Sequence, residues 1–314
     1  MEKIKNYAPI LIPTLNRFEH LKACIESLQK CNWADRSELF ISVDFPPSEK
    51  YEEGHTKILD FLNSGISGFK YVHVFIQSSN LGAGGNLKFL RDKVFQNYDR
   101  YIMTEDDNIF SPCFLEYMNK GLELYKEDNR VFAICAYNYP INIPDTYKHH
   151  NNFYYAHEYS AWGVGNWTDK FYKAQPYVTR DFGLFMLFNN WKKIPWKTLL
   201  DLIRSVKLGR FYGDLYRTLY LINNDMYSVF PTENLVTNNG HDGSGINCGS
   251  STKDIYSKQH RSSKVHFNFK GNVEKKEDKE IRNQLNNYFN IPLKSKLKVL
   301  FQIFYLKYEN SLDN

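Results

Sequence analysis

Apolar and polar positions follow two different periods along the first half of the chain. Short apolar runs predict buried strands at 8–13, 39–43, 71–76, 101–104 and 131–136. Between these runs the apolar residues recur at the spacing of one helix face, which predicts helices at 16–30, 55–62, 84–95 and 112–125. Strands that alternate with helices predict an α/β fold with a mostly parallel central sheet and helices on both faces.

The second half of the chain has a less regular pattern. It predicts a helix-rich stretch at 196–222, a strand at 226–230, a polar and glycine-rich loop at 236–249, and a last helix at 292–308. From about residue 262 the composition turns basic. We therefore expect a main domain over 1–262, with halves at about 1–136 and 137–262, and a basic C-terminal extension over 263–314 with an amphipathic helix.

Composition narrows the class of protein. The chain has 314 residues, of which 42% are hydrophobic and 24% charged, and this balance excludes a disordered chain. Its net charge of +5, from 40 basic and 35 acidic residues, gives no reason to expect a nucleic-acid partner. Five cysteines without a CxxC pair favour reduced thiols and a cytoplasmic protein. No apolar run approaches the length of a membrane-spanning helix.

The strongest chemical signal is the run Glu105, Asp106 and Asp107, which directly follows the fourth predicted strand. Three neighbouring carboxylates repel one another unless a cation or hydrogen-bond donors offset their charge. Mg²⁺ or Mn²⁺ fits, because these ions bind one or two carboxylates and complete their shell with substrate phosphates and water. The alternative interpretation is an acidic loop in which an Asp caps the next helix.

Polar residues also follow the first three predicted strands. They are Thr14, Asn16 and Arg17 after the first, Asp44 after the second, and Asn80, Gly82 and Asn86 after the third. In a parallel sheet these positions meet at one edge, where ligands bind, and the glycines there open a helix whose N-terminus favours an anion. Structural alternatives stay open: Asn16 as a helix cap, Asp44 as a turn residue and the glycines as a tight turn.

Several other chemistries lack their motifs. The sequence has no GxxxxGK[ST] loop, no HExxH and no GxSxG, and its GAGG segment lacks the third glycine of GxGxxG. A P-loop nucleoside triphosphatase and a dinucleotide-dependent enzyme are therefore not expected.

Taken together, these segments resemble nucleotide-sugar-dependent glycosyltransferases of the GT-A fold, which has a Rossmann-like sheet. The likeness is to the family 2 group and, in the acidic motif, to N-acetylglucosaminyltransferase I. It rests on APILIPTLNRFEHLKACIESL, EDD at 105–107, WGVGNW at 162–167, FYGDLYR at 211–217 and FPTENLVTNNGHDGSG at 230–245. The resemblance implies that Asp44 contacts the nucleotide base, that Asp107 is the metal ligand, and that Glu105 and Asp106 lie near the ribose and the sugar.

The resemblance also implies roles in the second half. Asp214 would be the catalytic base, with Glu158 and Asp242 as rival candidates. Trp162 and Gly163 would lie in the acceptor-side segment, and the loop that closes over the donor would include His241, Asp242 and Ser244.

We therefore expect a metal-dependent, inverting glycosyltransferase that uses Mn²⁺ or Mg²⁺ and a nucleotide-sugar donor, with a UDP-sugar favoured. Its acceptor would be a glycan or a lipid-linked saccharide in surface-polysaccharide synthesis. Two other functions stay open, a nucleotidyltransferase and a non-catalytic sugar-binding or scaffold protein. Two interpretations of the helix at 292–308 also stay open, namely contact with the inner face of the membrane and ordinary packing on the main domain.

Overall fold

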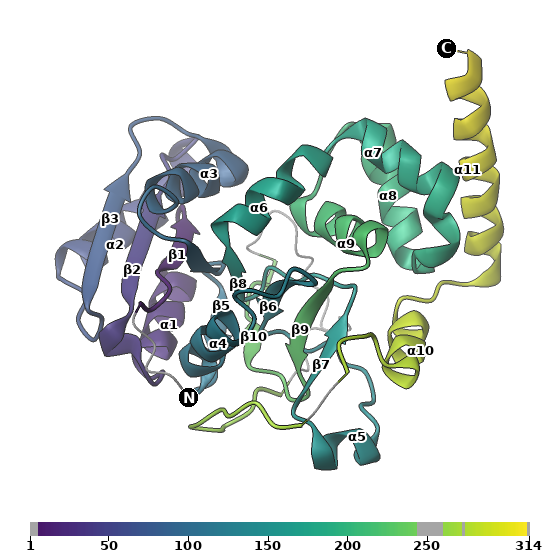
Figure 1. The fold of residues 1–314 in the computed structure, drawn as a ribbon. Helices are drawn as coiled ribbons and strands as arrows, with labels where there is room; N and C mark the ends of the chain where they lie inside the picture. The colour runs from purple at the N-terminus through teal and green to yellow at the C-terminus, as the bar shows by residue number, and fades with distance from the viewer. Residues whose placement is uncertain (1–5, 244–259, 272–273, 313–314) are drawn as a thin grey trace.

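The computed structural model describes residues 6–243, 260–271 and 274–312, and it shows a mixed α/β fold (Figure 1). The main sheet contains β1 (Ile10–Thr14), β2 (Glu38–Val43), β3 (Tyr71–Ile76), β4 (Arg100–Met103), β6 (Val131–Cys135), β7 (Phe153–Ala156), β8 (Val164–Trp167) and β9 (Tyr227–Pro231). A small second sheet contains β5 (Asn108–Phe110) and β10 (Val236–Asn238). The helices are α1 (Phe18–Gln29), α2 (Glu52–Asn63), α3 (Gly82–Val94), α4 (Phe114–Leu124), α5 (Asp145–His150), α6 (Thr168–Ala174), α7 (Arg180–Phe185), α8 (Trp196–Leu208), α9 (Gly213–Asn224), α10 (Lys279–Tyr288) and α11 (Leu293–Leu312).

The main sheet has eight strands in the order β3-β2-β1-β4-β8-β6-β9-β7. Strands β3, β2, β1, β4, β6 and β9 run in one direction, and β8 and β7 run against them. The predicted α/β class with a mostly parallel sheet is therefore confirmed.

The strand order reverses between β1 and β4. From β1 the chain moves outward to β2 and β3, and α3 then carries it back to β4 on the other side of β1. Right-handed crossovers place α1 and α2 on one face of the sheet and α3 on the other. Such a reversal opens a crevice beyond the strand ends, which is where α/β proteins bind ligands.

Two hydrophobic cores hold the fold together. The larger core fills the space around the main sheet and includes fully buried residues of β1, β2 and β6. The smaller core lies among α7, α8, α9 and α11, with residues such as Leu202 and Leu219 almost inaccessible to solvent. Figure 1 shows these helices grouped beside the sheet, with α11 at the outer edge.

All six predicted strands are present, but the structure corrects several details. Helix α1 begins after Arg17 rather than at Asn16, and no side chain caps it. The predicted loop at 236–249 begins with β10, which pairs antiparallel with β5. Four strands that the pattern did not predict (β5, β7, β8 and β10) have only three or four residues, too few to show a period.

The predicted C-terminal extension packs closely against the rest of the chain. Phe267, Ile281 and Leu285 belong to the larger core, and Leu285 is fully buried. Helix α10, which the sequence did not predict, supplies the last two of these residues, and α11 packs on α8. Within the described residues, no helix combines the length and the apolar character needed to cross a membrane.

Candidate active site at the strand reversal

Four side chains form an ion-paired cluster at the ends of β1 and β4. The guanidinium of Arg17 pairs with Asp106 through Nη2 and with Asp107 through Nη1, the latter at 2.7 Å. Thr14, the last residue of β1, donates its hydroxyl to Asp106 Oδ2 at 2.7 Å. We call Thr14, Arg17, Asp106 and Asp107 the switch-point cluster. The structure thus brings together four residues that the sequence placed at separate strand ends.

Charges in the switch-point cluster depend on one another. Burial opposes the charge of Arg17, but the two carboxylates more than offset it and raise the pKa of the guanidinium. Burial raises the pKa of Asp106, whereas Arg17 and the Thr14 hydroxyl hold it down. Asp106 and Asp107 are 4% and 3% exposed, so removal of Arg17 would leave two nearly buried carboxylates without their cation.

Asp107 is also fixed by the segment after β10. Asn238 donates its side-chain amide to Asp107 Oδ1 at 2.6 Å, and the backbone of Asn239 donates to the Asp107 carbonyl at 2.8 Å. At Gly240 a side chain would collide with the Asp107 carboxylate, so only glycine allows this approach. Asn238 is a site residue that the sequence pattern did not predict, although it lies within the NLVTNNG stretch that carried the resemblance.

The ends of β2 and β3 are joined by Asp44. Its Oδ1 accepts hydrogen bonds from the backbone amides of Phe45 and Leu81, at 2.9 and 2.8 Å, and its Oδ2 accepts one from Asn80 at 3.3 Å. Asp44 is 3% exposed and orders the turn that leads into α3. That turn uses Gly82 at φ +69°, a conformation that favours glycine.

Asn86 of α3 forms hydrogen bonds to two strands of the main sheet. It is 2% exposed, and its amide nitrogen donates to the carbonyls of Thr14 and Ser42, at 3.2 and 3.0 Å. It therefore ties α3 to β1 and β2. Asn16 contributes its carbonyl to the backbone of Phe18 at the start of α1.

Glu105 and Asp214 lie close enough to repel each other. Burial raises the pKa of Glu105 to about 8, and the charges of Asp107, Asp214 and Asp106 add to this rise. Burial raises the pKa of Asp214 as well, while Arg217 and the backbone amide of Ala161 lower it. Both carboxylates retain contact with solvent, which leaves them open to a ligand.

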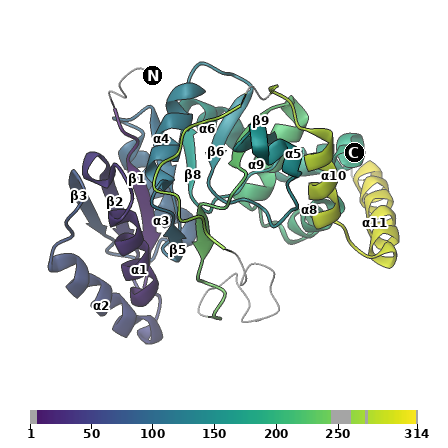
Figure 2. The same ribbon diagram turned by 90° about the horizontal axis from the view of Figure 1, so that it is seen from below.

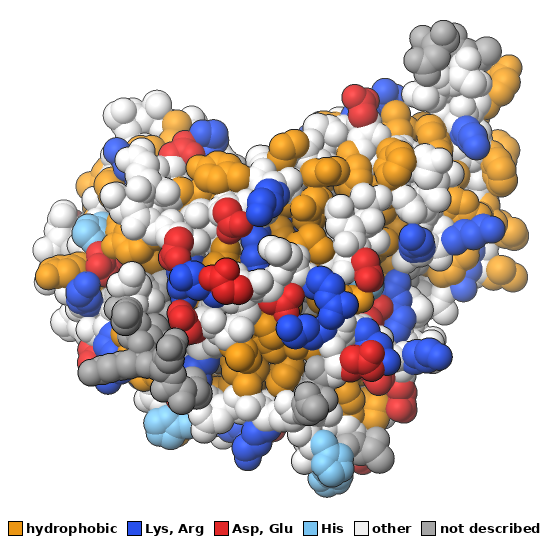
Figure 3. All heavy atoms as spheres, in the orientation of Figure 1, with side chains coloured by type: hydrophobic (Ala, Val, Ile, Leu, Met, Phe, Trp, Pro, Cys, Tyr) orange, Lys and Arg blue, Asp and Glu red, His pale blue; other side chains and the backbone are white. Residues whose placement is uncertain are grey.

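Two arginines that the sequence pattern did not predict lie against one aromatic ring, Phe171. Arg217 on α9 lies 4.8 Å from the ring centre of Phe171, and Arg91 on α3 lies 4.6 Å from the same ring. Arg217 is 7% exposed, and its Nε has no hydrogen-bond partner within the described residues. Figure 3, which has the orientation of Figure 1, shows acidic and basic side chains side by side near the middle of the molecule. Only the fold reveals this arrangement, because α3, α6 and α9 supply one residue each.

The remaining predicted residues lie in two places. Trp162 packs edge-on against His241, with ring centres 5.7 Å apart, and Asp242 contacts His20 of α1 at 3.0 Å. These contacts bring the segment after β10 to α1, beside the switch-point cluster. Gly163 has φ +66°, and a Cβ there would lie 2.9 Å from the ring of Phe114. Ser244 lies outside the described residues.

Glu158 faces α10 instead. It is 2% exposed, and Arg282 of α10 approaches it at 4.0 Å. Burial raises the pKa of Glu158 to about 7, with Arg282 lowering it and Glu277 raising it. The charged group that approaches Glu158 therefore comes from a C-terminal helix rather than from the switch-point cluster.

The carboxylates suit a divalent cation only in part. Within the described residues, no group of three or more His, Cys, Asp or Glu side chains is arranged to hold a metal ion. Both oxygens of Asp107 already have partners, Asn238 and Arg17. The donor set fits an Mn²⁺ or Mg²⁺ ion that has Asp107 as its protein ligand and takes its other oxygens from phosphate and water. Such an ion would replace Arg17 at that carboxylate.

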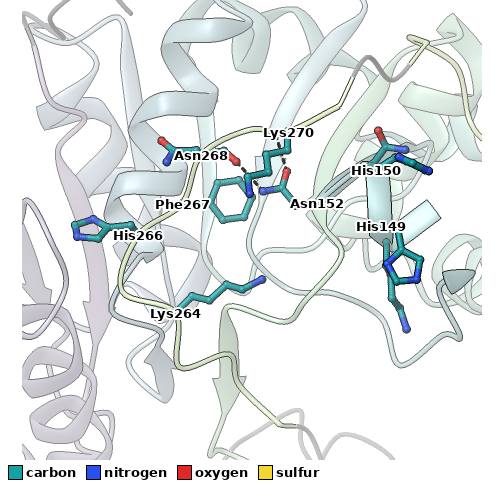
Figure 4. A pocket seen from close by; sticks show the side chains of 10 residues that line it. His149, His150, Asn152, Lys264, His266, Phe267, Asn268 and Lys270 are labelled. Carbon is teal, nitrogen blue, oxygen red and sulfur yellow. Dashed lines mark hydrogen bonds between the residues drawn. The ribbon is translucent and has the colours of Figure 1, made fainter. Parts of the chain in front are cut away.

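A separate cavity of about 270 Å³ lies between α5 and residues 264–270 (Figure 4). Its basic lining residues are Lys148, His149, His150, Lys264, His266 and Lys270. His149 and His150 are exposed. None of the predicted site residues lines this cavity.

No protein-family model and no curated protein matches the sequence. Among solved structures, the chain is similar to S. aureus TarS in complex with UDP-GlcNAc, with 10% identity, a TM-score of 0.38, and 55% of this chain and 48% of that chain covered. It is also similar to the mannosyltransferase PcManGT from Pyrobaculum calidifontis in complex with GDP-Man and Mn²⁺, with 8% identity, a TM-score of 0.35, and 53% and 46% covered. The chain thus spans about half of each solved chain.

Proposed function

We propose that this chain is a metal-dependent glycosyltransferase of the GT-A type. It would move a sugar from a nucleotide-diphosphate donor, with a UDP-sugar favoured, to a hydroxyl of a glycan or lipid-linked acceptor. The observation that carries the proposal is the switch-point cluster with Glu105 and Asp214 beside it. This arrangement combines a cation, paired carboxylates and a solvent-accessible acid at the crevice where α/β proteins bind nucleotides.

The donor side of the site would be formed by the ends of β1 to β4. Asp44 and Asn80 order the turn before α3, and the N-terminus of α3 favours an anion. Asp107 would hold the metal ion, which supplies positive charge to the leaving diphosphate. Arg17, released from Asp107, would then offer its guanidinium to a phosphate oxygen.

Asp214 would act as the general base. It takes the proton from the acceptor hydroxyl while that oxygen attacks the anomeric carbon, and the bond from that carbon to the diphosphate oxygen breaks. Attack opposite the leaving group inverts the anomeric configuration. The rise in the pKa of Asp214 through burial makes it a stronger base, and Arg217 opposes that rise, which favours the ionised form.

The cellular setting follows the resemblance rather than the site. We place the reaction in surface-polysaccharide or glycolipid synthesis on the cytoplasmic side of the membrane.

Calorimetric binding of UDP, GDP and dTDP, each with and without Mn²⁺, tests the proposal. We expect one nucleotide to bind only with Mn²⁺, and Asp107→Asn to abolish that binding. Asp35→Asn, which changes an exposed acid outside the site, is the matched control and should bind as the wild type does. If no nucleotide binds the wild type, or if Asp107→Asn binds equally well, the proposal is wrong.

Product analysis separates the two enzyme classes. Release of a nucleoside diphosphate from a nucleotide sugar supports glycosyl transfer, whereas release of pyrophosphate supports nucleotidyl transfer. Asp214→Asn should lower the rate by about 10²- to 10⁴-fold while nucleotide affinity stays unchanged, because a general base acts only in the chemical step.

A further inference from the structure

Helix α11 has two apolar faces, and within the described residues only one of them is covered. Val299, Ile303 and Leu306 are at most 6% exposed and pack into the smaller core. On another face, five large apolar side chains are 60–71% exposed, and we call them the α11 stripe: Leu293, Leu297, Phe301, Phe304 and Tyr308. At about 100° per residue they occupy an arc of about 80°, which makes one continuous apolar strip.

Lysines border the α11 stripe on both sides. By the same helical geometry, Lys294 and Lys298 lie along one edge, and Lys296 and Lys307 lie along the other. Glu309 is the one acidic residue of α11. Within the described part of the chain, none of the four lysines forms an ion pair with an acid.

A basic cavity of about 400 Å³ adjoins the beginning of α11, between the start of α8 and α10. Lys192, Lys193, Arg282 and Lys296 line it together with Trp196 and three asparagines, and none of its described lining residues is acidic. Arg282 is already paired with Glu277 at 3.3 Å. The three lysines therefore leave the cavity positively charged next to the stripe.

We propose that α11 lies on an anionic lipid surface, with the α11 stripe inserted at the level of the headgroups. The bordering lysines and the basic cavity would contact lipid phosphates. An apolar strip edged by lysines is the pattern of helices that lie in a membrane interface. Figures 1 and 2 show α11 at the outer rim of the molecule, where a flat surface can reach it.

Charge complementarity favours a lipid surface over a second copy of the chain. Two copies joined along their stripes would bring lysine borders together, with one acid per helix to offset them. An anionic membrane instead attracts every lysine near its surface. Hydrophobic and basic side chains also lie together along the outer edge of α11 in Figure 3.

Vesicle flotation with the full chain tests this proposal. We expect binding to phosphatidylcholine vesicles that contain about 30 mol % phosphatidylglycerol, and weaker binding to phosphatidylcholine alone. The triple variant Leu297→Ser, Phe301→Ser, Phe304→Ser should bind at least about tenfold more weakly, because three exposed apolar anchors are lost. Lys294→Gln with Lys298→Gln should reduce binding to anionic vesicles by about fivefold per lysine and leave binding to neutral vesicles unchanged.

A matched control replaces exposed apolar residues elsewhere. Tyr71→Ser with Leu124→Ser, at positions that are each 58% exposed, should bind as the wild type does. The proposal is overturned if the wild type ignores anionic vesicles or if the triple variant binds equally well. It is also overturned if light scattering shows a dimer that the triple variant breaks while vesicles are not bound. Nucleotide affinity, measured in parallel, is independent of α11 and tests the proposed enzyme separately.

Discussion

At the ends of β1 and β4, four polar side chains satisfy one another, whereas along α11 five large apolar side chains face solvent. The switch-point cluster carries its own cation, so both of its carboxylates are ion-paired before any ligand binds. The lysines beside the α11 stripe have no acid of the described chain within ion-pair distance. In the first region the charged side chains are therefore paired with one another, and a ligand must replace one of these partners. In the second region the side chains are complementary to a surface outside the protein.

Removal of Arg17 tests whether the first region is self-contained. Arg17→Met leaves Asp106 and Asp107 nearly buried without their cation, which should lower the free energy of unfolding by about 3–5 kcal/mol. Urea denaturation measures the loss. Arg36→Met, which removes an exposed guanidinium, is the control and should unfold at the same urea concentration as the wild type.

Mn²⁺ adds a second readout to the same variant. If the two carboxylates accept a metal ion in place of Arg17, Mn²⁺ should raise the stability of Arg17→Met more than that of the wild type. An equal effect on both proteins would show that Arg17 and Mn²⁺ do not compete for these carboxylates.

The C-terminal helices divide the second region into an inner and an outer part. Leu285 of α10 is fully buried in the larger core, so Leu285→Ala should cost about 2–5 kcal/mol. Phe301→Ala on the α11 stripe should change stability by less than about 0.5 kcal/mol, since Phe301 is 69% exposed. If the two variants lose the same free energy of unfolding, then α10 is not packed in the core while this face of α11 points outward.

Arg217 influences the proposed catalytic base, Asp214, through its charge. Its charge opposes the rise in the pKa of Asp214 that burial causes, so Arg217→Met should raise that pKa further. The proposed base is then protonated at a higher pH, and the acidic limb of the rate profile should move to higher pH, with a severalfold loss of rate on the acidic side. Arg217→Lys keeps the charge and should restore the limb. If Arg217→Met and Arg217→Lys give the same pH–rate profile, Arg217 acts through packing alone.

Much of the first region could be predicted from sequence, because strand ends in an α/β fold share one edge. Each residue of the switch-point cluster follows a predicted strand in the sequence. The fold brings these residues into contact. Their partners were not predictable from position alone. Local periodicity does not show that Arg17 pairs with both Asp106 and Asp107, or that Asn238 from a three-residue strand donates to Asp107.

The second region was harder to predict for a different physical reason. Helix α10 is mostly polar, and its two core residues, Ile281 and Leu285, are one turn apart within a charged stretch. The apolar residues of α11 were visible in the sequence, but sequence alone could not show which of them face α8 and which face solvent. Tertiary contacts divide that helix into its two faces.

The smallest expected effect concerns Glu105, the exposed neighbour of the switch-point cluster. Its pKa rises from 4.5 to about 8, because desolvation by the protein around it and the charges of the nearby carboxylates disfavour its ionised form. A raised pKa means that the stabilising, protonated form is complete below the ordinary value and is lost as the pH rises through about 8. The wild type should therefore melt at a lower temperature at about pH 9 than at about pH 6, by no more than about 2 °C because the side chain reaches solvent.

Glu105→Gln holds that side chain neutral at every pH, so its melting temperature should equal that of the wild type at about pH 4, where the wild-type carboxyl is protonated in both states, and exceed it by a growing margin up to about pH 8. Scanning calorimetry across this range measures both curves. Glu127→Gln, an exposed acid away from the cluster, should run parallel to the wild type. If the Glu105→Gln and wild-type curves stay parallel, Glu105 does not share the electrostatic field of Asp107 and Asp214. Asp106 and Asp107 would then titrate together with Arg17, and Glu105 would titrate independently of them.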